Sequence, residues 1–167
     1  MQLGAMPRGM VEWCEPALQK QGAIVLNATM KKFGAPATLI RDYDHWAVLL
    51  RPGQVTLGSL VLVCKEPRTA FSMISAAAFA ELQSITGHIE GVLGRMFNYD
   101  RINYLMLMMV DPDVHFHVIP RYEAMRTFAG QTFIDHGWPG PPDLASLNTT
   151  STEQNTQILT ALKADWP

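Results

Sequence analysis

The sequence predicts an α+β fold in which one long helix packs on a mainly antiparallel sheet. Short apolar runs of strand length end at turn signals such as Arg51-Pro52-Gly53 and Asp111-Pro112. Between these runs, apolar residues recur at helical spacing after Ser75. The order of helix, strands, long helix, strands and tail is typical of antiparallel α+β proteins.

Composition places the chain among single-domain globular proteins. Its 167 residues can bury a hydrophobic core without disulfides. The cysteines, Cys14 and Cys64, occupy neither a Cys-x-x-Cys nor a zinc-like spacing. The formal net charge of -2 offers no broad attraction to nucleic acid, and no apolar run reaches the roughly 18 residues of a membrane helix. We therefore expect a cytoplasmic protein that binds neither nucleic acid nor a membrane, with Cys64 as a buried free thiol.

Hydrophobic periodicity and turn residues divide the chain into elements. The expected elements, in order, are a helix within residues 11–33, strands over 46–50 and 58–64, a long helix starting after Ser75 and ending near 98–100, and strands over 104–110 and 113–118. The run over 104–110 is apolar at every position, so we expect that strand to be covered on both faces.

The two ends of the chain differ from this middle part. Residues 1–10 have no hydrophobic period and are expected to be flexible. Residues 137–143 hold too many Pro and Gly for regular structure. A last short helix is allowed by three apolar residues near the end, Ile158, Leu159 and Leu162. We expect one domain over residues 11–124 and an irregular C-terminal extension over residues 125–167, packed on the domain or on a partner subunit.

The strand over residues 113–118 carries the functional signal. Polar and apolar residues alternate there, which places Asp113, His115 and His117 on one face and three apolar side chains toward the core. A histidine in such a row can attack phosphorus while its neighbours donate hydrogen bonds to phosphoryl oxygens. Imidazole and carboxylate also suit divalent metals, and a solvent face can carry two histidines without a function. Spacing alone leaves these three interpretations open.

Residues 113–121, Asp-Val-His-Phe-His-Val-Ile-Pro-Arg, resemble the signature of the histidine triad family of nucleotide hydrolases and transferases. That signature is His-φ-His-φ-His-φ-φ, with φ apolar, usually followed by Pro and a basic residue. Residues 58–65 resemble the family's Gly-His-Leu-Leu-Val-Ile-Pro-Lys strand, and Asn103 lies near its nucleotide-binding asparagine. The resemblance covers residues 40–122. It implies a histidine triad fold, here with an N-terminal helix and an irregular C-terminal tail added.

The resemblance also implies roles for five residues. His115 is expected to attack an α-phosphorus and form a covalent nucleotidyl-histidine intermediate, its far ring nitrogen donating to the carbonyl of Asp113. His117, Asp113 and Ser59 are expected at the phosphate, and Asn103 at the nucleotide. Phosphoramidates or dinucleoside polyphosphates are the implied substrates. A homodimer is implied, with no cofactor and no metal.

Asp113 and Ser59 replace histidines of the family pattern. A carboxylate two residues along a strand lies about 6.6 Å away and repels a phosphoryl oxygen by about 2.5 kcal/mol at an effective dielectric of about 20. Alternatively, Asp113 favours the imidazolium form of His115 or His117, which would help to bind phosphate. Three hypotheses follow. They are a weaker or retuned enzyme, a nucleotide-binding module without catalysis, and a metal site built on Asp113 and the two histidines.

Overall fold

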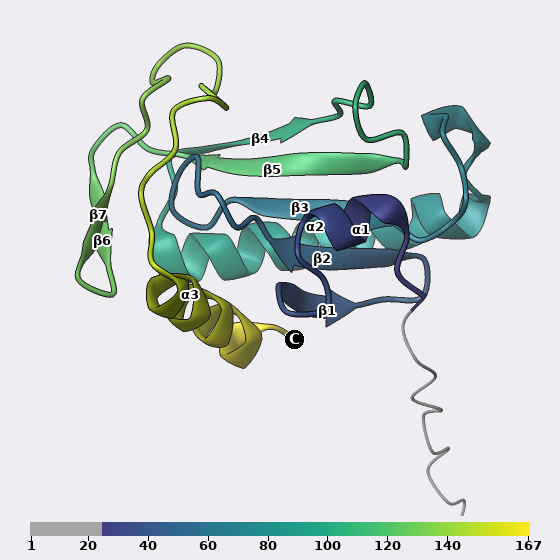
Figure 1. Cartoon of the computed structure of the whole chain (residues 1–167), viewed down its shortest axis with the longest axis horizontal. Coiled ribbons are helices and arrows are strands. Elements are labelled where there is room, and N and C mark those ends of the chain that lie inside the picture. Colours follow the sequence, from purple (N-terminus) through teal and green to yellow (C-terminus); the bar gives the residue numbers. More distant parts are fainter. Residues whose placement is uncertain (1–24) are drawn as a thin grey trace, which may run out of the picture.

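The computed structural model describes residues 25–167, which form a five-stranded sheet, a two-stranded hairpin and three α-helices (Figure 1). The main sheet has the strand order β1-β2-β3-β5-β4, and every pair in it is antiparallel. The elements are α1 (Ala28–Lys32), β1 (Leu39–Asp42), β2 (Trp46–Leu50), β3 (Leu60–Cys64), a 3₁₀ turn (Phe71–Met73), α2 (Ala76–Phe97), β4 (Arg101–Leu105), β5 (His115–Arg121), β6 (Arg126–Phe128), β7 (Gln131–Phe133) and α3 (Thr152–Asp165). The predicted fold class is confirmed.

The long helix α2 begins and ends at residues that suit these positions. The hydroxyl of Ser75 accepts a hydrogen bond from the amide of Ala78 (3.1 Å), as an N-cap does. Asn98 ends the helix in the left-handed conformation, at φ 48°. The buried residues of α2 recur at helical spacing and include Ile85, Ile89 and Val92. The predicted helix is therefore confirmed at both ends.

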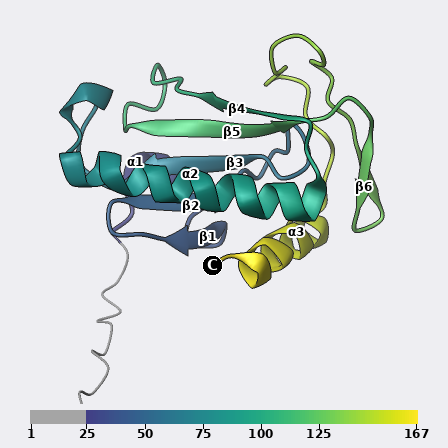
Figure 2. The same ribbon diagram turned by 180° about the vertical axis from the view of Figure 1, so that it is seen from behind.

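The two faces of the main sheet are covered differently. The helix α2 lies along one face, as Figure 2 shows, and the main hydrophobic core fills the space between them. On the opposite face the short helix α1 covers β2 and β3 (Figure 1). A second, smaller core lies under α1 and consists of Met30, Ala47, Leu49, Val61 and Val63. The sheet is therefore the middle layer of three.

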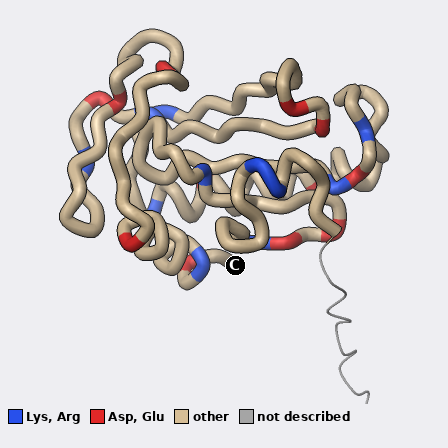
Figure 3. The backbone as a smooth tube through the Cα atoms, viewed as in Figure 1, with Lys and Arg blue, Asp and Glu red and all other residues tan. Residues whose placement is uncertain are grey.

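Charged side chains are absent from the neighbouring strands β2 and β3. The strands β2 and β3 contain only apolar residues and one cysteine, and every residue in them is buried. Figure 3 shows charged residues on the helices α1 and α3, in the connections and near the ends of the strands. Cys64 is buried and free, as predicted. Among residues 25–167, no helix is long and apolar enough to cross a membrane.

The C-terminal extension lies against the main sheet and α2. Ile158, Leu162 and Trp166 belong to the main core. The indole of Trp166 donates to the hydroxyl of Tyr43 (2.8 Å). The predicted last helix is confirmed as α3, whose N-terminus carries a capping box formed by Ser151 and Gln154. The hairpin of β6 and β7 and the edge strand β1 were not predicted.

The prediction of a strand over residues 104–110, covered on both faces, is wrong. The strand β4 spans Arg101–Leu105 and lies at the edge of the sheet. It ends at Leu105, which pairs with His117, and the chain then turns back to enter β5. Residues 106–114 make this connection, in which Met109 and Val110 are 94% and 81% exposed.

The predicted N-terminal helix is tested only in its last part. The described part of that segment contains α1, whose N-cap is Asn27 and which ends at Phe33. The next residue, Gly34, has φ 85°, a conformation that glycine adopts without strain. The rest of that predicted helix, Cys14 and residues 1–10 lie outside the described residues.

Candidate functional site

Two histidines lie side by side on one face of β5. The rings of His115 and His117 are 5.2 Å apart between centroids, with an angle of 80° between their planes. Val118 points the other way and belongs to the main core, as the alternating pattern predicted. Opposite the histidines on β3 stand Val63 and Val61 of the smaller core under α1. Both histidines are buried between the sheet and α1.

One hydrogen bond fixes the tautomer of His115. Its Nδ1 lies 2.8 Å from the backbone carbonyl oxygen of Asp113. A carbonyl oxygen can only accept, so Nδ1 carries the hydrogen and Nε2 keeps its lone pair. Nε2 is buried, and none of the described residues forms a hydrogen bond with it. The hydrogen bond implied by the family resemblance is therefore present, and it leaves a free basic nitrogen.

The carboxylate of Asp113 is directed at α1. Its Oδ2 accepts from the backbone amide of Thr29 (3.1 Å) and from the Thr29 hydroxyl (2.9 Å). A second link, between Lys32 and Asp111 (2.7 Å), also connects α1 to the segment before β5. The ring of Phe33, which follows α1, lies 5.6 Å from the ring of His117. These contacts hold α1 over the two histidines.

The hydroxyl of Ser59 is used within its own turn. It accepts from the amide of Thr56 (3.0 Å) and donates to the carbonyl of Thr56 (2.8 Å). Ser59 is completely buried. The structure thus gives Ser59 and Asp113 partners within the protein, and their role at a phosphate stays a prediction.

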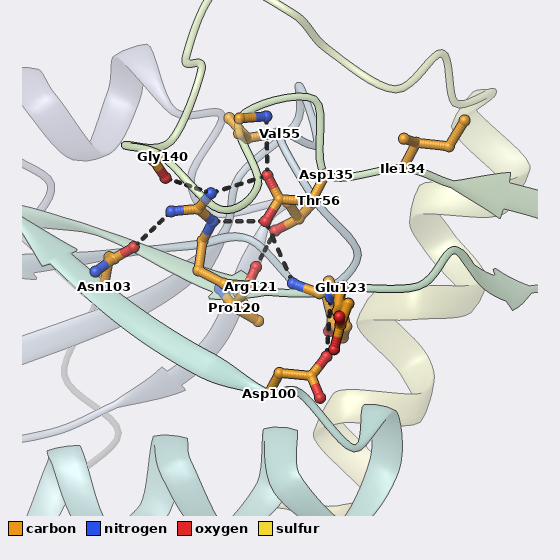
Figure 4. A network of polar contacts seen from close by, with 12 residues as sticks. Val55, Thr56, Asp100, Asn103, Pro120, Arg121, Glu123, Ile134, Asp135 and Gly140 are labelled. Carbon is orange, nitrogen blue, oxygen red and sulfur yellow. Dashed lines mark hydrogen bonds and ion pairs between the residues drawn. The ribbon is translucent and has the colours of Figure 1, made fainter.

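Asn103 belongs to a polar network centred on Arg121 (Figure 4). The guanidinium of Arg121 makes a two-pronged ion pair with Asp135, at 2.6 and 3.1 Å, and also donates to the carbonyl of Gly140 (2.9 Å). Its Nη1 donates to the amide oxygen of Asn103 (2.9 Å). Both charged side chains are almost fully buried, with 5% of Arg121 and 1% of Asp135 exposed.

A cavity of about 510 Å³ lies beside this network. It is lined by Arg101, Asn103, Leu105, Arg121 and the loop from Trp138 to Pro142. In the register of β4 and β5, Leu105 pairs with His117 and Asn103 with Ile119. Directly paired residues project to the same face of a sheet. The cavity therefore opens on the face that carries the histidines.

Burial controls the charge of His117. Loss of water is the main reason that the pKa of His117 falls from its usual value to about 4, and the neighbouring His115 and Arg51 contribute to the same shift. The imidazole is therefore neutral near pH 7 and can donate through one ring nitrogen only. Its Nδ1 is buried without a hydrogen-bond partner among the described residues.

Backbone comparison connects this geometry with known structures. The sequence matches no protein-family model and no curated protein. Among solved structures, a histidine triad protein from Bradyrhizobium japonicum is 18% identical and has a TM-score of 0.66, over 86% of this chain and 98% of that chain. One from Sinorhizobium meliloti is 18% identical with a TM-score of 0.67, over 86% and 97% of the two chains. The chain has the histidine triad fold. A diadenosine triphosphate hydrolase from Plasmodium falciparum is 11% identical with a TM-score of 0.57, over 77% and 76%.

The histidine triad fold of this chain also brings in residues that sequence reasoning missed. Thr29 of α1 binds the carboxylate of Asp113, and the ring of Phe33, just after α1, lies against the ring of His117. Arg51 follows β2, and its amide donates to the carbonyl of Ser59. Burial lowers the pKa of Arg51, whose Nε has no hydrogen-bond partner in the described part of the chain. In the sequence, Arg51 is only part of a turn signal, and no local pattern separates it from a solvated arginine.

The described residues do not form the metal site that was one hypothesis for Asp113, His115 and His117. Across residues 25–167, no three His, Cys, Asp or Glu side chains come together in a way that could hold a metal ion. One oxygen of the Asp113 carboxylate, Oδ2, accepts two hydrogen bonds from Thr29.

Proposed function

We propose that this protein is a nucleotide-phosphate hydrolase or nucleotidyl transferase in which His115 attacks an α-phosphorus. The observation that carries the proposal is the hydrogen bond from His115 to the carbonyl of Asp113, which leaves the lone pair on Nε2. In the first step a bond forms between Nε2 and phosphorus while the bond to the leaving group breaks. Water or another acceptor then takes the nucleotide from the histidine. Phosphoramidates and dinucleoside polyphosphates are the proposed substrates.

His117 is proposed as a donor to a phosphoryl oxygen. Its ring lies beside that of His115, and its low pKa keeps it neutral. A neutral imidazole donates from one nitrogen and does not lower the nucleophilicity of its neighbour by adding a positive charge. This combination supports a phosphate site at the His115–His117 pair.

Asp113 is proposed to act on the position of α1 rather than on phosphate. Its carboxylate already accepts two hydrogen bonds from Thr29, so a phosphate would have to compete with them. Ser59 is equally engaged within its turn. The repulsion between a carboxylate and a phosphoryl oxygen is reduced when amide and hydroxyl dipoles face that carboxylate.

A homodimer that works without a cofactor or a metal is also proposed. Among residues 25–167, β4 is the edge of the main sheet and no strand pairs with its outer side, so its outer hydrogen-bonding groups could pair with a strand of a second copy. Asn103 on this strand is the proposed contact for the nucleotide. Its neighbour Leu105 pairs directly with His117, which supports a substrate that extends from the histidines along β4.

A binding module without turnover is the second candidate function. The observation that favours it is the closure over His115, whose Nε2 is buried beneath α1. Such a module would bind a nucleotide tightly and never form the bond to phosphorus.

Turnover of adenosine phosphoramidate and diadenosine triphosphate separates the two candidates. We expect the purified protein to hydrolyse at least one of them, and His115→Ala to lower the rate on the order of 1,000-fold. His136→Ala, at an exposed histidine, is the matched control and should leave the rate unchanged. Saturable nucleotide binding with no turnover of either substrate would favour the binding module instead.

A further inference from the structure

The cavity beside β4 begins next to the histidines and extends away from them. Leu105 lines it and pairs with His117, whereas Arg101 lines it and pairs with Arg121, at the other end of β5. Four residues of strand span about 13 Å, which is close to the length of one nucleotide. In Figure 1, the loop that closes the cavity lies near the end of β5 that is remote from α1.

The network around Arg121 orients a donor toward this cavity. Asp135 and Gly140 fix the guanidinium of Arg121, whose Nη1 then holds the amide oxygen of Asn103 (Figure 4). The amide nitrogen of Asn103, Nδ2, therefore does not face Arg121, and it makes no hydrogen bond within residues 25–167. Asn103 thus presents a donor, and not an acceptor, to whatever fills the cavity.

The charge of the cavity is positive. Asp135 neutralises Arg121. Arg101 is exposed and donates only to the backbone carbonyl of Asp100, and no carboxylate of the described chain pairs with it. One free guanidinium and one amide donor therefore line the same space, which suits an anionic group such as a phosphate.

The remaining wall of the cavity is apolar and partly aromatic. Trp138 lies half-buried among prolines 139, 141 and 142, and Leu105 closes the end near His117. An indole and a free guanidinium that line the same cavity suit a charged group joined to a planar one, which can stack on the ring. The complete cavity therefore matches a planar group that carries a phosphate.

We propose that this cavity is the subsite for the leaving group, and that the leaving group it takes is a second nucleoside phosphate. This inference rests on the proposed function. The phosphorus must lie at Nε2 of His115, and the leaving group departs on the side opposite the attacking nitrogen. As the bond from Nε2 to phosphorus forms, the phosphorus–oxygen bond breaks, and its electron pair leaves with the second nucleotide. Arg101 and Asn103 hold the phosphate of that nucleotide, and Trp138 stacks on its base. All three are specificity residues.

Two substrates that transfer the same adenylyl group test the subsite. Diadenosine triphosphate has a leaving group that would fill the cavity, whereas adenosine phosphoramidate releases only ammonia. We expect Arg101→Gln to lower kcat/KM for diadenosine triphosphate by about tenfold and to leave kcat/KM for the phosphoramidate within about twofold. Arg41→Gln, at an exposed arginine of β1, is the matched control and should change neither. Equal effects of Arg101→Gln on both substrates, or no effect on either, would overturn the inference.

If the protein turns over neither substrate, the proposed function is wrong, but the subsite can still be tested by the binding of ADP. Titration calorimetry with ADP should give a Kd that rises at least about fivefold in Arg101→Gln, and not in Arg41→Gln. Asn103→Asp replaces the amide donor by an acceptor and should weaken ADP binding as well. An ADP affinity that is the same in both variants and in the wild type would refute the subsite.

Discussion

Removing the carboxylate of Asp113 should loosen α1 and lower the stability of the protein. In Asp113→Ala, the amide and the hydroxyl of Thr29 both lose their acceptor. Each lost hydrogen bond of this partly buried kind costs about 1 kcal/mol, which gives about 2 kcal/mol in total. Asn27 still caps α1, since its side chain accepts from the amide of Met30, so the helix itself persists. For a chain of this size, the loss corresponds to a fall in Tm of about 4–8 °C.

Thermal unfolding followed by circular dichroism measures this effect. Asp44→Ala removes the same charge at an exposed position and is the control, for which we expect a change within about 0.5 kcal/mol. The double-mutant cycle with Thr29→Val should give a coupling energy of about 1 kcal/mol, because the valine removes the hydroxyl and keeps the amide. If Asp113→Ala is no less stable than the control, or if the cycle is additive, Asp113 does not hold α1.

Two further predictions concern buried groups. Since the pKa of His117 is lower in the folded protein than in the unfolded chain, the unfolded chain takes up the proton first, and stability present above about pH 6.5 is lost as the pH falls toward 4. Between these pH values His117→Gln should lose about 2 kcal/mol less unfolding free energy than the wild type. If Tm falls equally with pH in both proteins, the prediction is wrong. Asp135→Asn leaves Arg121 buried without its counter-charge and should cost about 3–5 kcal/mol. Asp165→Asn, which breaks the exposed pair with Arg95, should cost about 1 kcal/mol or less, so similar losses in both variants would contradict this account.

The parts of the fold that could be predicted depend on residues close together in the sequence. The helix α2 follows from the Ser75 cap and from apolar residues at helical spacing. The alternation in β5 places His115 and His117 on one face, whatever the rest of the chain does. The hydrogen bond to the carbonyl of Asp113 also lies within this segment. In α2 and β5, residues close together in the sequence are therefore enough to predict the structure.

The parts that could not be predicted depend on partners that are distant or weakly encoded. Thr29 and Asp113 are separated by 84 positions, and nothing near either residue indicates the other. The hairpin of β6 and β7 has strands of only three residues, joined through Ala129 and Gly130 at positive φ. The preferred sequences of such turns begin with Asn, Asp or Gly rather than Ala. The bounds of β4 were predicted wrongly, as 104–110 in place of Arg101–Leu105, because an apolar run does not show which of its residues pair with another strand.

Peptide mapping of a rapidly quenched reaction tests the central claim most directly. The protein is mixed with diadenosine triphosphate or adenosine phosphoramidate, quenched under mildly basic conditions and digested for mass spectrometry. The account predicts one adenylylated site, at His115, that is absent from His115→Ala and present in the control His136→Ala. Turnover that proceeds without an adduct, or with the adduct on His117 or another residue, would contradict the account.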